Sequence, residues 1–152
     1  MCAALWTGEW YRIPAVQLAQ IIHRPVLWYW GHEHKLTIYD RHHVEKGIEA
    51  YGRCVGHGGM PVEHGKPPDL ECPWLAWDNR RYDNGEDIDV GFNGHVNVTL
   101  DGPKFCAEYV DLKGTQLFTE EWRVDLTSGV LEGPNLKKVL NDSSLHFQHE
   151  TK

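Results

Sequence analysis

Near the N-terminus of the chain, the spacing of apolar residues predicts a short helix followed by a strand. Four apolar residues have the i, i+3, i+4, i+7 spacing of one helix face: Ala15, Leu18, Ala19 and Ile22. Pro14 suits a first helical position, so we expect a helix over residues 14–23. The apolar run Val26–Trp30 has no polar alternation, which is typical of a strand covered on both faces.

Alternation of apolar and polar residues predicts further strands after this run. Residues 35–38 alternate, so a second strand is expected directly after the first one. Residues 40–50 are charged and irregular, and a strand-like piece at 51–55 leads into the glycine-rich segment 56–61. Residues 62–91 are rich in Pro, Asp and Asn, and we expect them to form a long ordered loop.

The pattern changes over residues 94–125, where three alternating segments are separated by two turn sequences. Residues 101–103 mark the first turn and residues 111–114 mark the second, which predicts an antiparallel β-meander. The last segment, 127–152, is polar, and one helical turn is expected near 134–140.

The length of 152 residues predicts a single domain over residues 1–152 that can bury a sizeable core. We divide it into four parts: a helix, strand and ligand-loop part at 14–61, the long loop at 62–91, the meander at 94–125 and a polar tail at 127–152.

Composition narrows the class of protein. A net charge of -7 argues against general nucleic-acid binding, which depends on basic surfaces. The four cysteines form no C-x-x-C pair, so the spacing supports neither a zinc ribbon nor a dithiol redox motif, and disulfides stay open. Neither an export signal nor an apolar membrane span is evident, so we expect a cytoplasmic protein without a membrane partner.

Candidate chemistry begins directly after the first apolar run, at the sequence Gly31-His32-Glu33-His34. On an extended backbone His32 and His34 leave the chain on the same face, and Glu33 leaves on the other. Imidazole is a common metal ligand, yet an H-x-H pair alone fits two hydrogen-bonded structural histidines equally well. The H-E-x-x-H pattern of zinc proteases is excluded, because Leu36 stands at its last position.

Two further residues are candidates for a cleft or a supporting role. His57 lies among glycines, where backbone can approach a ligand closely, and it could line the same cleft as His34. Arg53 could contact a phosphate. The alternatives are that the glycines serve a tight turn beside an incidental His57, and that Arg53 is a surface residue.

Three pieces of the segment 18–63 form one recognisable pattern: Pro25 to His34, then Tyr39, then residues 51–63 with the sequence Tyr-Gly-Arg-Cys-Val-Gly-His-Gly-Gly-Met-Pro-Val-Glu. Together they resemble the C-terminal part of a calcineurin-like metallophosphoesterase. That family ends its ligand set with a Gly-His-x-His block after a buried strand. The resemblance implies a mostly β α/β fold: the C-terminal portion of a four-layer α-β-β-α sandwich, ending in the antiparallel meander.

The resemblance also implies a chemistry. His32 and His34 would each bind one of two divalent metal ions, such as Mn, Fe or Zn. The two ions would hold a phosphate-ester substrate and activate a bridging hydroxide for in-line attack.

The chain departs from that family in its other ligand blocks. Only the last of the family's five blocks is present, and the similar spellings Asp40-Arg41-His42 and Asn93-Gly94-His95 stand in the wrong places. Two histidines supply neither the charge nor the number of ligands that a dinuclear centre needs. We therefore expect a fragment or truncated form of a phosphoesterase that is inactive alone, and we assign no catalytic residue.

Two other functions stay open. The chain could be a non-enzymatic β-rich binding or assembly module, which would self-associate through exposed apolar surface. It could also be a mononuclear metal protein that uses His32, His34 and either His57 or His64.

Overall fold

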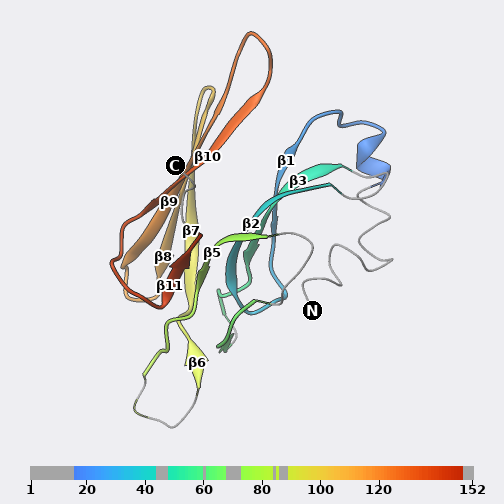
Figure 1. The fold of residues 1–152 in the computed structure, drawn as a ribbon. Helices are drawn as coiled ribbons and strands as arrows, with labels where there is room; N and C mark the ends of the chain where they lie inside the picture. The colour runs from blue at the N-terminus through green and yellow to red at the C-terminus, as the bar shows by residue number, and fades with distance from the viewer. Residues whose placement is uncertain are drawn as a thin grey trace.

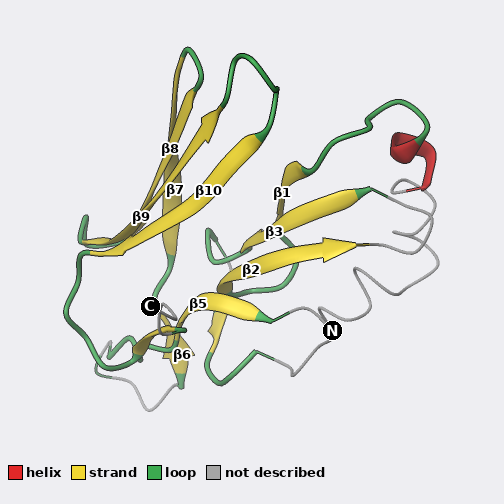
Figure 2. Cartoon of the chain, turned by 45° about the horizontal axis from the view of Figure 1, so that its top comes forward, coloured by secondary structure: helices red, strands yellow, loops and turns green. Residues whose placement is uncertain are grey.

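The computed structural model describes residues 16–43, 48–59, 61–67, 73–83, 85 and 89–148. This part of the chain is nearly all β, with three sheets and one helical turn at residues 16–19 (Figures 1 and 2). The predicted helix at 14–23 is therefore confirmed only over that single turn, and residues 14 and 15 lie outside the described residues. The mostly β character that we predicted is confirmed.

The largest sheet contains five strands: β1 (Val26–Trp30), β2 (Leu36–His43), β3 (Glu49–Val55), β5 (Trp74–Asp78) and β11 (Leu145–Phe147). Their order is β1-β3-β2-β5-β11, so β3 lies between the two strands that are consecutive in sequence. β1 pairs with β3 in parallel, and the other pairs are antiparallel. The chain segment between β1 and β2 must therefore cross the end of β3.

The second sheet is the antiparallel meander β7 (Gly94–Asp101), β8 (Lys104–Asp111), β9 (Gln116–Val124) and β10 (Leu131–Lys138). The three predicted meander strands are confirmed, and β10 is a fourth. Gly102 and Gly114 lie in the tight connections with positive φ angles of 55° and 81°, which glycine adopts without strain. A small third sheet pairs β4 (Val62–Glu63) with β6 (Val90–Gly91).

Three predictions were wrong about where strands form. Residues 40–50 are not irregular throughout, because β2 continues to His43 and β3 begins at Glu49. The expected loop at 62–91 contains three strands, and one of them, β5, lies inside the largest sheet. The helical turn expected near 134–140 is part of β10, whose Gly133-Pro134 pair is accommodated by a register shift against β9.

The core forms where the two larger sheets pack face to face. The cluster joins apolar residues from both sheets: Leu36, Ile38, Ala76, Ala107, Tyr109, Leu117, Phe118 and Leu145. The rings of Tyr51 on β3 and Trp122 on β9 meet edge to face, with centroids 4.5 Å apart. Toward their far ends the β7–β8 and β9–β10 hairpins project beyond the larger sheet (Figures 1 and 2).

Candidate metal-ligand turn

The two histidines of the Gly-His-x-His sequence lie in the turn that joins β1 to β2, at the lower end of the larger sheet in Figure 1. His32 has a φ angle of 74° and is the only non-glycine residue with positive φ within the described ranges. Its side chain is exposed, whereas that of His34 is half-buried. A positive φ is uncommon for any residue with a Cβ, so this backbone is held by its surroundings.

Backbone hydrogen bonds fix the turn on both sides of His34. The Lys35 N–H donates to the Glu33 carbonyl at 2.8 Å, and the Glu63 N–H of β4 donates to the His34 carbonyl, also at 2.8 Å. The Lys35 ammonium lies 3.8 Å from a Glu63 carboxylate oxygen. The small β4–β6 sheet is thereby attached to the histidine turn.

The end of β3 supports the turn from the other side. The Cys54 thiol lies 3.6 Å from the Glu33 carbonyl oxygen and 3.5 Å from that of Lys35. Burial raises the pKa of Cys54 to about 12, and the nearby Glu33 carboxylate also raises it. Cys54 therefore supports the turn as a protonated donor at neutral pH.

Glu33 is buried between its two histidine neighbours in the sequence. Its side chain is 8% exposed, and its Oε1 atom makes no hydrogen bond. A solvated carboxylate is thus excluded at this position. A buried carboxylate oxygen without a donor is costly, and such groups are concentrated at functional sites.

The turn contains two imidazoles as candidate metal ligands, those of His32 and His34. Among the described residues, no group of three or more His, Cys, Asp or Glu side chains is placed to hold a metal ion. His64, which could complete a mononuclear site, instead forms a 2.8 Å hydrogen bond with the Asn79 carbonyl and lies 3.6 Å from Asp89. The described residues therefore do not complete the set of ligands that a dinuclear centre needs.

His57 lies in the interface between the sheets. Its side chain is 1% exposed, and its carbonyl accepts hydrogen bonds from the Gly94 N–H and the Asn93 amide. A Cβ on Gly94 would lie 2.9 Å from the Nε2 atom of His57, so the ring packs directly against the start of β7. The buried ring is not accessible to a ligand from solvent in this arrangement.

The environment of the His57 ring keeps it neutral. Burial lowers its pKa to about 4, although Asp78 and the Val55 carbonyl favour the protonated form. Neither ring nitrogen makes a hydrogen bond of standard geometry.

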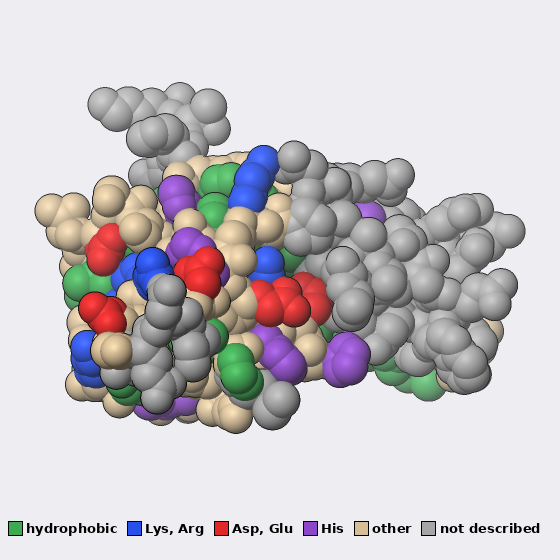
Figure 3. Space-filling model, turned by 90° about the horizontal axis from the view of Figure 1, so that it is seen from below, with side chains coloured by type: hydrophobic (Ala, Val, Ile, Leu, Met, Phe, Trp, Pro, Cys, Tyr) green, Lys and Arg blue, Asp and Glu red, His purple; other side chains and the backbone are tan. Residues whose placement is uncertain are grey.

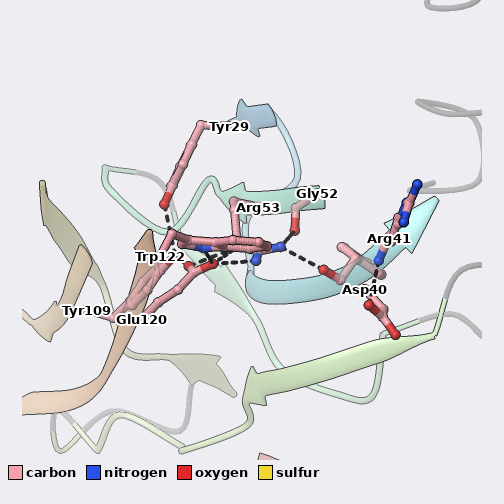
Figure 4. A network of polar contacts seen from close by, with 9 residues as sticks. Tyr29, Asp40, Arg41, Gly52, Arg53, Tyr109, Glu120 and Trp122 are labelled. Atoms are coloured by element: carbon pink, nitrogen blue, oxygen red, sulfur yellow. Dashed lines mark hydrogen bonds and ion pairs between the residues drawn. The ribbon is translucent and has the colours of Figure 1, made fainter. Parts of the chain in front are cut away.

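Arg53 is fully buried and joins the two sheets (Figure 4). Its Nε–H donates to both carboxylate oxygens of Glu120 on β9, at 2.8 and 2.9 Å. Its Nη1 donates to the carbonyls of Tyr39 and Gly52, at 2.7 and 2.8 Å. Burial alone would lower the pKa of Arg53, but the Glu120 carboxylate raises it. With its donors engaged inside the protein, Arg53 does not reach a phosphate ester, and a surface position is excluded as well.

The Glu120 carboxylate has further donors around it. The Tyr109 hydroxyl donates at 2.7 Å, and the Trp122 indole N–H donates to the other oxygen. The Tyr29 hydroxyl lies 3.3 Å from that of Tyr109, and burial raises the pKa of Tyr29 to about 12. These groups surround the buried carboxylate with hydrogen-bond donors, which offsets the cost of taking it out of water.

Sequence reasoning missed three buried charged residues: Glu120, and Arg80 with its partner Asp111. Glu120 stands between Phe118 and Trp122 at alternating positions of β9, so its place on the inward face was readable from the period of the strand. Arg80 pairs with Asp78 and Asp111, with nitrogen–oxygen distances of 2.9 Å. The burial of Arg80 could not be predicted, because Arg80 follows β5, and the Pro, Asp and Asn content of residues 62–91 predicted a loop there.

The surface at the lower end of the molecule carries mixed charges. Histidine, acidic and basic side chains are interspersed on the face drawn in Figure 3. Within the described residues no helix has the length and apolar character required to span a bilayer.

Comparisons with known proteins add no assignment. No family model, no curated protein and no solved structure matches this chain.

Proposed function

We propose that this chain is part of a metal-dependent phosphoesterase, in which His32 and His34 each bind one ion of a dinuclear centre. The observation that carries the proposal is the strained backbone of His32, with a φ of 74°, in a turn that presents its imidazole to solvent. Strained residues are maintained where function requires them. Because the strained residue belongs to a Gly-His-x-His sequence, orientation of a metal ligand would explain the strain.

The surroundings of the turn support a ligand role over a purely structural one. Structural histidines are expected to be buried and hydrogen-bonded, whereas His32 is exposed. Two separate segments hold the backbone around His34, the end of β3 and the strand β4, beside the turn's own bond from Lys35 to Glu33. Preorganisation of this kind is what a metal site demands of its ligands.

The same proposal includes the overall architecture. The five-stranded and four-stranded sheets supply the two central layers of a four-layer α-β-β-α sandwich. The remaining ligands, which include the bridging carboxylate, come from residues other than the described ones. The chain without them does not hydrolyse phosphate esters, because two imidazoles cannot hold two dications close together.

Metal binding by the isolated chain tests this function. Dialysed protein is titrated with Mn²⁺ and Zn²⁺ and then assayed on a generic phosphodiester with Mn²⁺. We expect weak binding that is lost in both His32→Ala and His34→Ala, with hydrolysis at background. His95→Ala is the matched control, because His95 is also an exposed histidine. Binding that survives both substitutions overturns the ligand role. Hydrolysis that depends on the two histidines overturns the claim that this chain lacks the other ligands of the site.

A specific observation favours a second candidate, the non-enzymatic assembly module. Large apolar side chains are exposed near the ends of the projecting hairpins: Val98, Leu100, Leu126 and Val130. Exposed apolar surface of this kind promotes association between protein chains. A chain that binds no metal and forms a defined oligomer through these residues would favour this candidate.

A further inference from the structure

We propose that Gly56, which follows β3, is a positioning residue for the two histidine ligands. It lies 22 residues beyond His34 in the sequence, and a Cβ on it would meet the turn at the backbone of Glu33 and of Gly31. The inference rests on the proposed ligand role of His32 and His34, and it adds the residue that sets their relative geometry.

The space around Gly56 is the first step of the argument. A Cβ at this position would lie 1.7 Å from the Glu33 carbonyl oxygen and 2.7 Å from the Glu33 carbonyl carbon. Contacts below 3.0 Å are forbidden for real Cβ atoms, and both of these atoms are backbone, so neither can swing aside as a side chain would. Any side chain at residue 56 must displace the histidine turn.

The backbone conformation of Gly56 is the second step. Its φ angle lies outside the positive range that favours glycine, unlike that of Gly65 or Gly114. Alanine could therefore adopt the local backbone of residue 56. The need for glycine comes from the neighbouring turn and not from the conformation of residue 56 itself.

The role of the Glu33 carbonyl is the third step. It belongs to the peptide that joins Glu33 to His34, and it accepts the Lys35 N–H at 2.8 Å. The Cys54 thiol approaches the same oxygen. Because this peptide is one of the two that separate His32 from His34, rotating it changes the direction of the His34 imidazole relative to that of His32. Gly56 and Cys54 together form the surface that fixes this plane.

Gly59 provides a matched control within the same segment. A Cβ on Gly59 would meet no atom within 4 Å, and its φ also lies outside the positive range. Gly56→Ala and Gly59→Ala add the same methyl group three residues apart. A difference between the two variants therefore reports on the contact with Glu33.

The experiment measures the histidine side-chain NMR signals of the metal-free proteins and their affinities for Zn²⁺. We expect the His32 and His34 signals to move in Gly56→Ala and to stay in place in Gly59→Ala. Affinity for Zn²⁺ should fall about 10- to 100-fold in Gly56→Ala, the range for residues that orient ligands, and less than about twofold in Gly59→Ala. Near-ultraviolet circular dichroism checks that the sandwich is intact.

Failure of this inference differs from failure of the proposed function. If the wild-type chain binds no Zn²⁺, the ligand role fails, while the NMR comparison still tests the positioning role. If His32→Ala abolishes binding but Gly56→Ala binds as the wild type does, Gly56 has no positioning role. Should Gly56→Ala not fold, Cys54→Ala and Cys54→Ser decide. Loss of affinity in the alanine variant and recovery in the serine variant, which keeps a donor, support the inference, and equal affinities overturn it.

Discussion

Arg53 on β3 and Glu120 on β9 form an ion pair whose two side chains are both fully buried between the sheets. The guanidinium and the carboxylate hold β3 and β9 together at the centre of the sandwich (Figure 4). A buried pair of this kind compensates two costly desolvated charges, so removal of one partner leaves the other unpaired.

We predict a large loss of stability in Glu120→Ala. The buried guanidinium would lose its counter-charge, and unfolding free energy should fall by about 3–5 kcal/mol in urea titrations. Glu121→Ala at the next, exposed position of β9 should change it by less than about 0.5 kcal/mol. The double variant Arg53→Met, Glu120→Leu should recover much of the loss. A loss in Glu120→Ala as small as that in Glu121→Ala would show that the pair does not hold the sheets together.

His57 should make stability depend on pH in a mildly acidic window. Its folded pKa is lowered to about 4 by burial, below the unfolded value of 6.5, so the unfolded chain binds more protons in between. The contribution of neutral His57 to the free energy of unfolding is complete above pH 6.5 and is lost as the pH falls to about 4. The difference between these two pKa values amounts to about 3 kcal/mol of unfolding free energy.

The measurement is unfolding free energy against pH for the wild type, His57→Leu and the exposed-site control His23→Leu. Asp78, Arg80 and His95 act on the His57 ring, and Asp111 has a lowered pKa of its own that matters at lower pH. The slope between pH 6.5 and 4 should be reduced in His57→Leu and retained in His23→Leu. Equal slopes in all three proteins contradict the prediction.

Cys54 should resist alkylation in the native protein. Its thiol is buried and its pKa is raised to about 12, so little thiolate is present at pH 8. Cys106 is half-buried, and its pKa is raised as well. Mass-spectrometric mapping after iodoacetamide should find Cys106 modified before Cys54, with both modified in urea. Earlier modification of Cys54 would mean that the turn above it opens readily.

Self-association should depend on the projecting hairpins. Leu100 on β7 is 75% exposed, and Leu100→Lys would place a charge in any apolar contact that it makes. Light scattering should find a smaller average mass for this variant than for the wild type. Thr99→Lys, on the opposite face of β7, is the control and should leave the mass unchanged. A wild-type chain that is monomeric at all concentrations rules out this surface as an assembly site.

The strands of regular alternation were predictable because period-two burial is local. The meander from Gly94 lies where the alternation places it. The unbroken apolar run Val26–Trp30 does form a strand, but β1 lies at the edge of its sheet and its residues are half-buried rather than covered on both faces. β5 was not predictable, because it is short and gains its hydrogen bonds from β2 and β11, which are distant in the sequence. β10 was not predictable, because Gly133-Pro134 interrupts its pattern. Turn-forming residues such as Gly133 and Pro134 cannot indicate from sequence alone that a neighbouring strand will tolerate a shift in register.

The sequence by itself determined the mostly β character of the chain, and it predicted His32 and His34 as candidate metal ligands. Only the tertiary structure decided that Gly56 must lack a side chain and that Cys54 lies beneath the turn. It also decided that Arg53 meets Glu120 in the core, 67 residues away. The physical reason is that strand periodicity depends on neighbours along the chain. Contacts between sheets depend on which strands pair, and that is fixed only when the whole core packs.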